Sequence, residues 1–419
     1  MISVSEAQEI VRSQCLPLAA EMVAVAAALD RVLAQDLTSQ VDLPSFDNSA
    51  MDGFALRCAG SKVGEGTEYA MGGEQAAGDG VSHSDGAQAW EIMTGARVPD
   101  GLDTVVPIEQ VEMMIRRPDG GPARIRLTTA VSPGQHVRRA GEDIARGEMA
   151  MARGSRLRAA HLMLLAGLGV AEVAVVVRPK VALLCTGREL VDEPAQVLQP
   201  GQIRNSNGPF LAARLGAAGA QLVYRETVSD DASAFVVGLG GALRAGAGII
   251  VSTGAVSVGR YDFVPSALQA LGAEILFHKV AMRPGKPLLF ARLAGGQLYF
   301  GLPGNPVSSA VGFRFFVEAA LRSQLGLPGE QPWRLPLAHD TRGRPGLRLL
   351  QKAELRLSVD GRLQVSLLHG QESFKTLSLL AANAWASLPE TDVVLSAGTQ
   401  VDVFPLGHES SGLLGEQLR

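Results

Sequence analysis

The sequence predicts a multidomain α/β protein, with a central block of alternating strands and helices between β-rich segments. The chain has 419 residues, more than one hydrophobic core commonly spans, so we expect two to four domains. Residues 178–326 alternate short apolar runs with helical patterns, which is typical of a mainly parallel sheet covered by helices on both faces. The flanking segments show the period of two and the Gly, Pro and Asp turns of antiparallel strands.

Composition and charge restrict the class of function. The chain is 47% hydrophobic and 19% charged, which predicts folded cores. A net charge of −4 argues against a nucleic-acid-binding protein, since such proteins commonly carry a strongly basic domain. Three scattered cysteines form no ligand pattern and favour a reducing compartment. No apolar stretch approaches the ~20 residues of a membrane span, and no secretory signal is evident, so we expect a cytoplasmic protein without membrane contact.

Local patterns predict the elements before the central block. Residues 1–35 give two helical patterns, the first capped by Ser5. From Phe54 to about Val137, short alternating runs between turns predict a small β-domain. A helix over Ala159–Leu168 and a strand over Val173–Val177 are expected to follow.

The central block and the C-terminal region follow the same reasoning. A helical pattern spans Val307–Leu325, and beyond Pro332 period-two runs predict a β-domain of about five strands. The expected strands of the central block are Val181–Leu184, Leu222–Glu226, Ile249–Ser252, Glu274–Phe277, Pro287–Phe290 and Leu298–Phe300, and the expected helices are Pro209–Leu215, Ala232–Ala245 and Val264–Leu271.

Four glycine-rich segments punctuate the central block, at Thr186–Leu190, Ser252–Gly259, Arg283–Pro287 and Gly301–Pro306. Ligands of open α/β sheets bind at the carboxyl ends of strands, where glycine lets backbone amides approach an anion. Positive charge comes from Lys279, Arg283 and Lys286, which otherwise form a solvated basic patch. The pattern predicts a site for a phosphorylated or oxyanionic small molecule.

Three further motifs precede this block. Asp47–Ala55 reads Asp-Asn-Ser-Ala-Met-Asp-Gly-Phe-Ala, which by itself is typical of a capped turn. Met93–Ala96 and Arg139–Ile144 follow it. In this order, with the four glycine-rich segments, the motifs closely resemble the MoeA family, the molybdopterin molybdenumtransferases related to the E-domain of gephyrin. The resemblance covers about residues 40–320 and continues more weakly to the C-terminus.

The resemblance implies an architecture, a reaction and an assembly. Family members insert molybdate into adenylylated molybdopterin, hydrolyse the adenylyl group and release AMP, assisted by Mg²⁺. They are homodimers whose active site lies in the cleft between subunits, and transient contact with the molybdopterin adenylyltransferase is implied. The implied domains are a helical and linker portion (1–44 and 141–177), an inserted β-domain (45–140), a three-layer molybdopterin-binding α/β domain (178–326) and a C-terminal β-barrel (327–419).

The resemblance also assigns acidic residues to the site. Glu189 and Asp230 are expected nearest the Mg²⁺ and the pyrophosphate, because hard carboxylates suit this ion. Asp262 is expected to anchor the pterin or to cap the helix that follows. The acidic active-site positions with the family's threonine are Asp52, Thr94, Asp143, Glu189, Asp230 and Asp262.

The remaining assignments concern substrate binding. Lys279, Arg283 and Lys286 are expected to neutralise the anions, with Arg283 as a bidentate donor. Pro303 and Pro306 shape the pocket, whereas Ser252, Thr253 and Gly254 offer hydroxyl and amide donors to the pterin or its phosphate. Lys352 and Ser373 align with positions that reach the cleft.

Two departures from the family pattern bear on function. Arg188 stands where relatives commonly have an acid, and Ala255 replaces a glycine, which predicts a negative φ there. Two other functions stay open: a nucleotide pyrophosphatase like the CinA-type proteins, which leaves the Asp52 and Thr94 segments without a role, and a molybdopterin-binding scaffold without turnover, which Arg188 keeps open.

Overall fold

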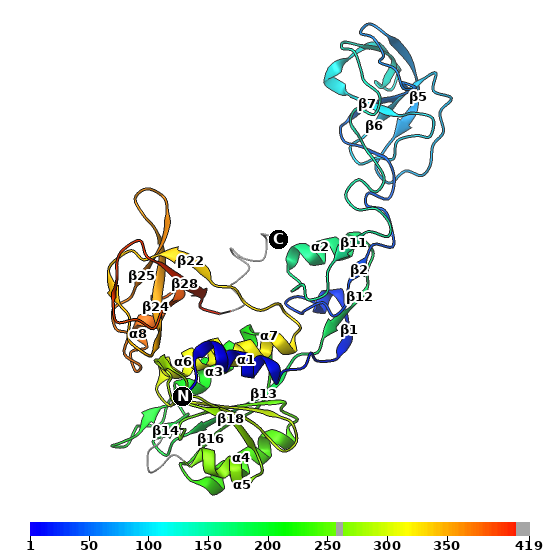
Figure 1. Cartoon of the computed structure of the whole chain (residues 1–419). Helices are drawn as coiled ribbons and strands as arrows, with labels where there is room; N and C mark the ends of the chain where they lie inside the picture. The colour runs from blue at the N-terminus through cyan, green and yellow to red at the C-terminus, as the bar shows by residue number, and fades with distance from the viewer. Residues whose placement is uncertain (257–262, 408–419) are drawn as a thin grey trace. The chain divides into compact units, whose positions relative to one another are not determined.

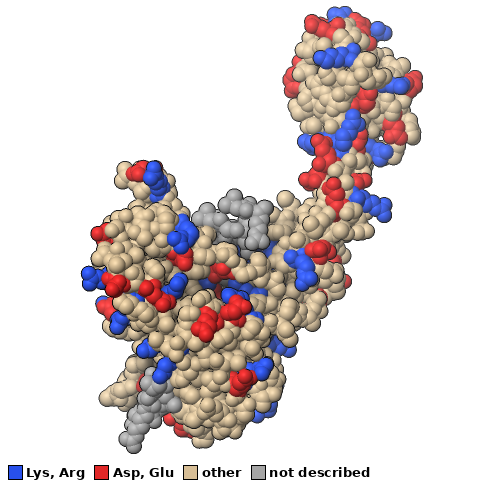
Figure 2. All heavy atoms as spheres, viewed as in Figure 1, with Lys and Arg blue, Asp and Glu red and all other residues tan. Residues whose placement is uncertain are grey.

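The computed structural model of the chain describes residues 1–256 and 263–407. Two compact units make up the chain (Figure 1). One consists of Met1–Met22, Asp30–Ala34 and Ala174–Arg419, and the other of Val23–Leu29 and Gln35–Val173. No helix among the described residues is long and apolar enough to cross a membrane. On the face viewed in Figure 2, acidic and basic side chains are interspersed.

The smaller unit is built on a six-stranded sheet, as the alternating pattern from Phe54 to Val137 predicts. Its pairs are antiparallel except for the parallel pair β5 and β6. Phe54, Ile125 and Leu127 belong to its buried core. The strand order is β7 (Thr104–Pro107), β4 (Gly53–Leu56), β6 (Ala89–Ile92), β5 (Glu68–Gln75), β9 (Pro122–Leu127) and β8 (Val111–Arg116).

Shorter elements complete this unit. Helix α2 (Ala159–Gly167) forms where the sequence predicts one. The short pairs join segments far apart in the sequence: β3 (Asn48–Ser49) with β10 (Val137–Arg138), and β2 (Leu37–Thr38) with β11 (Met149–Met151).

The N-terminal prediction needs two corrections. The first helix, α1 (Val4–Ser13), is capped by Ser3 and not by Ser5, because Ser3 Oγ accepts a hydrogen bond of 3.1 Å from Glu6 N. The predicted second helix is wrong. The chain instead forms β1 (Ala20–Ala24) and a short 3₁₀ turn, and Leu33 then bridges Val175 in antiparallel register. The apolar residues near Leu33 fit both the helical and the strand period, and the pairing with a distant strand decides between the two structures.

The larger unit contains the predicted three-layer α/β domain. Its sheet runs in the order β16 (Gln221–Val228), β13 (Lys180–Thr186), β17 (Ile249–Thr253), β21 (Leu298–Leu302), β20 (Leu289–Arg292) and β18 (Glu274–His278). The first four strands are parallel, and β20 is antiparallel to both of its neighbours, so that β18 runs in the same direction as the first four. Figure 1 shows α4 (Ala232–Arg244) and α5 (Val264–Ala270) on one face, with α1, α3 (Asn207–Ala217), α6 (Pro306–Gly312) and α7 (Glu318–Gln324) on the other.

Alternate residues of the central strands fill two separate cores. On β13, Val181 and Leu183 belong to the core under α1, α3 and α7, whereas Ala182 and Leu184 belong to the core with Phe235 of α4. Successive side chains of a strand point to opposite faces. The continuous apolar run predicted from the sequence therefore serves both layers.

The C-terminal strands close into a small barrel. Neighbouring strands pair antiparallel in the order β22 (Trp333–Pro336), β28 (Gln400–Pro405), β26 (Ala384–Leu388), β24 (Arg348–Leu357) and β25 (Leu363–Leu367). Ala338 N then donates to Val365 O at 2.9 Å and closes the ring. In addition, β19 (Met282–Arg283) of the α/β domain pairs with β24 in parallel register, Arg283 opposite Leu349.

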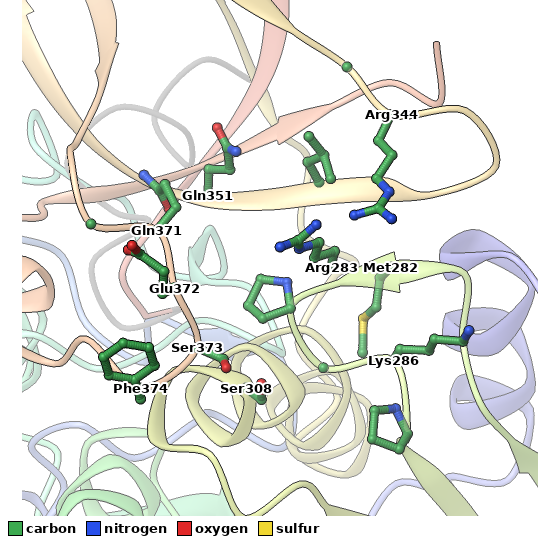
Figure 3. Close-up of a pocket in the computed structure, with 16 residues that line it drawn as sticks. Met282, Arg283, Lys286, Ser308, Arg344, Gln351, Gln371, Glu372, Ser373 and Phe374 are labelled. Atoms are coloured by element: carbon green, nitrogen blue, oxygen red, sulfur yellow. The ribbon is translucent and has the colours of Figure 1, made fainter. Parts of the chain in front are cut away.

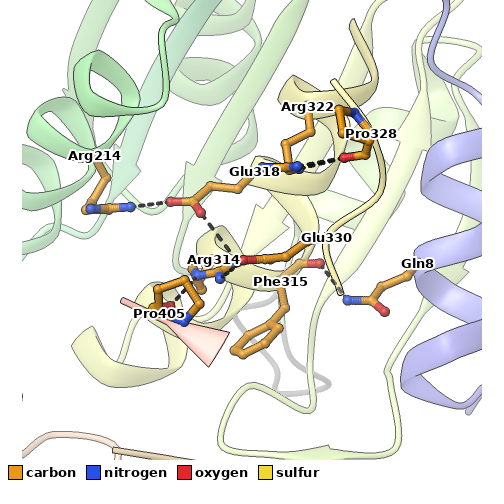
Figure 4. Close-up of polar contacts among 9 residues, drawn as sticks. All are labelled: Gln8, Arg214, Arg314, Phe315, Glu318, Arg322, Pro328, Glu330 and Pro405. Atoms are coloured by element: carbon orange, nitrogen blue, oxygen red, sulfur yellow. Dashed lines mark hydrogen bonds and ion pairs between the residues drawn. The ribbon is translucent and has the colours of Figure 1, made fainter. Parts of the chain in front are cut away.

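A buried ionic network joins the barrel to the α/β domain (Figure 4). Arg314, in the π-helical turn Phe313–Val317 between α6 and α7, is 3% exposed. It donates to both oxygens of Glu330, at 2.8 and 2.6 Å, and to Pro405 O of β28 at 3.0 Å. Glu318, buried 3.5 Å from Arg314, also accepts from Arg214 of α3 at 2.5 Å. Residue 214, residues 314–330 and residue 405 therefore meet in one network of charges and hydrogen bonds.

We expect Arg314→Met to lower the free energy of unfolding of this unit by about 3–5 kcal/mol, because it leaves the largely buried Glu330 without its cation and deprives the buried Glu318 of one of its cations. Urea unfolding followed by the fluorescence of Trp333 and Trp385 measures the change. As a control, Arg334→Met removes an ion pair to Asp402 whose arginine is 65% exposed, and should cost less than about 1 kcal/mol. Equal losses in both variants would contradict the role assigned to the network.

Candidate active site

The carboxyl ends of the parallel strands bring three of the glycine-rich segments together. Gly187 N donates to Val228 O at 3.0 Å, Gly254 N to Leu302 O at 3.0 Å, and Thr186 Oγ1 to Thr253 O at 2.9 Å. These bonds tie the ends of β16, β13, β17 and β21 into one edge, as expected for ligand sites of open α/β sheets.

Glu189 and Asp230 lie at this edge. Arg188 N donates to Asp230 Oδ2 at 3.4 Å, which places Asp230 beside the loop that carries Glu189. Among the described residues, no three His, Cys, Asp or Glu side chains group so that they could hold a metal ion. Mg²⁺ commonly binds through one or two carboxylates plus substrate phosphates. The two side chains therefore fit such an ion in donor type, with phosphate oxygens completing its coordination.

The end of β17 differs from the expectation. Ser252 is buried, and its hydroxyl bonds with the Tyr299 hydroxyl inside the core. The expectation that the Ser252 hydroxyl is free to bind a ligand is therefore wrong, because Ser252 points to the same side of its strand as Ile250 and lies in the same core. Thr253 is also buried, and the Gly254 amide is paired, although Gly254 itself is partly exposed at the edge. Asp262 lies outside the described residues.

Two non-glycine residues near this edge have left-handed backbone. Ala255 has a φ of 53°, so the predicted negative φ is wrong, and the alanine adopts the conformation in which glycine is common. Lys279, at the end of β18, has a φ of 77°. Such strain persists where surrounding structure fixes it: Lys279 N donates to Leu288 O at 2.9 Å, and His278 Nε2 bonds to Val256 O at 2.7 Å.

The Gly301–Pro306 segment leads from β21 into α6. Pro306 is the first residue of α6, where its missing N–H costs no hydrogen bond. Ser309 Oγ donates to Pro303 O, and Asn207 Nδ2 of α3 donates to Gly304 O at 2.7 Å. Both contacts fix the loop, and the shaping role expected for Pro303 and Pro306 stays a prediction.

A cavity of about 710 Å³ lies between the α/β domain and the barrel (Figure 3). Arg283 and Lys286 line it, and Figure 3 shows the guanidinium groups of Arg283 and Arg344 facing the same space. Ser308 of α6 and Ser373 of the barrel face each other at its floor. Within the described residues, Arg283, Lys286 and Arg344 have no ion-pair partner. Three unneutralised cations and two hydroxyls make this cavity suited to an oxyanion.

Sequence reasoning missed Arg344 and Ser308. The parallel pairing of β19 with β24 brings the start of the barrel strand beside Arg283, and no local pattern predicts that pairing. Ser308 stands two residues after Pro306, in the first turn of the predicted helix. That position at a helix start is a signal from which Ser308 could have been predicted as a binding residue.

Of the two barrel residues expected to reach the cleft, Ser373 lines the cavity and Lys352 does not. Ser373 lines the cavity, and its carbonyl accepts from Val307 N at 2.9 Å. Lys352 is 0% exposed, and its ammonium donates to Gly370 O at 2.6 Å, Lys375 O at 2.9 Å and Ser378 Oγ at 2.7 Å. In this structure Lys352 does not reach the cavity that Ser373 lines.

The smaller unit gathers the other three motifs. Thr94 donates to Asp52 Oδ1 twice, through its backbone N at 2.6 Å and its hydroxyl at 2.8 Å. These two bonds lower the pKa of Asp52, the backbone bond being the larger cause. β3 pairs with β10, and Asp47 accepts from Arg139 at 2.5 Å and from Ala140 N at 2.8 Å.

Asp143 belongs to the same group of segments. Its backbone N donates to Leu43 O at 3.0 Å, and its side chain is exposed. The structure therefore divides the expected catalytic residues into two groups, with Asp52, Thr94 and Asp143 in the smaller unit and Glu189 and Asp230 in the larger.

Comparison with known proteins covers nearly the whole chain. Residues 2–169 match the MoeA N-terminal region (domain I and II), residues 182–323 a probable molybdopterin binding domain, and residues 334–406 the MoeA C-terminal region (domain IV). The chain is 38% identical to a molybdopterin molybdenumtransferase of Synechococcus elongatus, covering 97% of this chain and all of the relative. It is 34% identical to the Bacillus subtilis enzyme of that name, over 93% of this chain and 90% of the relative.

Solved structures agree with the fold. A molybdopterin biosynthesis MoeA protein from Pyrococcus horikoshii superposes with a TM-score of 0.79 at 26% identity, covering 97% of this chain and 100% of that one.

We expect Thr94→Val to raise the pKa of Asp52 toward its ordinary value of 3.8, because the charged carboxylate loses one of its two donors. The lowered pKa means that the contact contributes its full stability above the ordinary value of 3.8 and loses it as the pH falls through the folded pKa. NMR titration of the aspartate carboxyl carbons measures both. Asp231, whose pKa Ser229, Ala234 and Ser233 lower to about 2, is an internal control that should not move. An unchanged Asp52 titration in the variant would contradict this assignment.

Proposed function

Because the chain belongs to the family of molybdopterin molybdenumtransferases, we propose that it inserts molybdate into adenylylated molybdopterin with hydrolysis of the adenylyl group and release of AMP. The observation that carries the proposal is the cavity in which Arg283 and Arg344 face one space without carboxylate partners among the described residues. A tetrahedral oxyanion presents several acceptor oxygens, and arginine offers them paired N–H donors. The α/β edge beside it supplies the strand-end loops for the pterin and its phosphates.

The two substrates are both anions and repel each other. Fixed cations such as Arg283, Lys286 and Arg344 offset that repulsion without reorganising during the reaction. Ser308 and Ser373 supply hydroxyl donors that orient the oxyanion at the cavity floor. The residues of the cavity thus bind and orient, and they need no nucleophile of their own.

Hydrolysis of the adenylyl group adds water across the phosphoanhydride bond, giving AMP and the phosphate of the pterin. Glu189 and Asp230 are the residues that we assign to an Mg²⁺ ion. Such an ion polarises a phosphoryl oxygen when bound. Asp52, with its lowered pKa, stays ionised near neutral pH and is suited to orient a water molecule or a molybdate hydroxyl.

The separation of the acidic residues into two units supports a homodimer whose sites use both subunits. In α2, Leu165 alone is buried, and Met163 is 75% exposed on a helix that is apolar apart from His161. An uncovered apolar helix of this kind marks an interface. We assign the assembly to the cytoplasm, in transient contact with the adenylyltransferase that makes its substrate.

AMP release from adenylylated molybdopterin, measured with and without molybdate in the presence of Mg²⁺, tests the proposal. Release that molybdate stimulates supports it. Hydrolysis of free nucleotides independent of molybdate indicates a CinA-type pyrophosphatase, and binding without release indicates a scaffold; either result refutes the transferase. Glu189→Gln and Asp230→Asn should each abolish most of the stimulated release if these carboxylates hold the ion.

We expect Arg344→Met to raise the molybdate concentration needed for half-maximal AMP release by about 10- to 100-fold, the range for losing a hydrogen bond to a charged group. Steady-state assays at saturating adenylylated molybdopterin measure the shift. Arg342→Met is a matched control, since Arg342 is exposed two residues away and does not line the cavity. Equal effects of the two substitutions would remove Arg344 from the site.

For the dimer, we expect a mass of twice 43.9 kDa by light scattering after size exclusion. Met163→Asp should shift the equilibrium to monomer, because a carboxylate would be desolvated at the interface. Val359→Asp in the barrel, at a fully exposed position, should leave the mass unchanged. A dimer that Met163→Asp leaves intact would place the interface elsewhere.

A further inference from the structure

One wall of the oxyanion cavity is a loop with little secondary structure of its own. The loop leaves β25 and runs from Leu368 to the short helix α8 (Leu377–Leu380), and Gly370–Phe374 line the cavity. Ser373 belongs to this stretch. The position of its hydroxyl therefore depends on what holds the loop.

Lys352 of β24 holds both ends of that stretch. Its ammonium donates to the O atom of Gly370, where the wall begins, and to Lys375 O directly after it, at 2.6 and 2.9 Å, and to Ser378 Oγ at 2.7 Å. An ammonium has three donors, so these three acceptors use them all. Lys352 is 0% exposed, and burying a charge without such partners is costly.

The backbone of Lys352 is tied to the same wall. Lys352 N donates to Gln371 Oε1 at 3.0 Å, and Gln371 Nε2 donates to Lys352 O and Leu368 O, each at 2.8 Å. Within the wall, Ser373 O accepts from Val307 N, next to Ser308. The strand that carries Lys352 also pairs with β19 through Arg283. One strand thus sets the relative positions of Ser373 and Arg283.

We propose that Lys352 is a positioning residue of the oxyanion site, which acts by clamping the Gly370–Lys375 wall and contacts no substrate. The inference rests on the proposed function for the identity of the anion. It predicts that loss of the clamp weakens molybdate binding through displacement of Ser373 and Gln371, while the groups at the α/β edge keep their places.

The test compares Lys352→Met, which keeps the length of the side chain but removes its donors, with Lys180→Met at the exposed amino end of β13. At saturating adenylylated molybdopterin, Lys352→Met should raise the KM for molybdate about tenfold or more and leave kcat within about threefold, as for a lost binding contact. Hydrogen–deuterium exchange of the full chain should rise in peptides covering 368–380. Lys180→Met should change neither quantity.

If Lys352→Met does not fold, Ser378→Ala decides, since it removes one acceptor and keeps the buried lysine. Its KM for molybdate should rise about threefold, with faster exchange in the same loop. Unchanged KM and exchange in the folded variants, or a fall in kcat with KM unchanged, would overturn the positioning role. The exchange measurement needs no turnover. Wild-type protein that releases no AMP with molybdate would therefore refute the proposed function, whereas unaltered loop exchange would refute the clamp.

Discussion

A charged arginine in a dry interior must be neutralised where it lies, and Arg314 imposes that constraint on this molecule. Glu330 comes from the linker before the barrel, Glu318 from α7, and Pro405 O from the last barrel strand. Loss of Glu318 or Glu330 would leave the buried Arg314 less well neutralised, and loss of Pro405 O would leave its Nε–H without an acceptor. The barrel is thereby fixed against the α/β domain, and the oxyanion cavity has walls from both. The geometry of Arg283 and Arg344 depends on that attachment.

Much of the fold follows from local pattern. The apolar runs at Val181–Leu184 and Ile249–Ser252 predict strands because both faces of the central sheet are covered, and the structure confirms them. The glycine-rich segments identify the strand ends, and the sequence predicts Arg283 and Lys286 there as cations that neutralise an anion. The prediction of a second N-terminal helix is wrong because the apolar residues around Leu33 fit both the helical and the strand period. Only the pairing of Leu33 with Val175 decides between the two.

The parts that the sequence does not predict depend on contacts distant in the chain. Arg344 joins Arg283 through a strand pairing across more than sixty residues, which leaves no local signal. The burial of Ser252 could have been predicted, since Ser252 points to the same side of its strand as Ile250. A hydroxyl beside Gly254, however, suggests a ligand-binding role. Lys352 is similar: the family resemblance predicts a side chain that reaches the cleft, and only the loop carbonyls explain its burial.

The pairing of β19 with β24 has a consequence for how such a chain can be divided. A piece ending after α7 would retain the whole six-stranded sheet and every loop along its carboxyl edge. It would nevertheless leave β19 without its partner strand β24, and it would lose the barrel residues that line the other side of the oxyanion cavity. Arg283, Lys286 and Ser308 stay in such a piece, whereas Arg344 and Ser373 are lost, so only the intact polypeptide has both walls of the cavity.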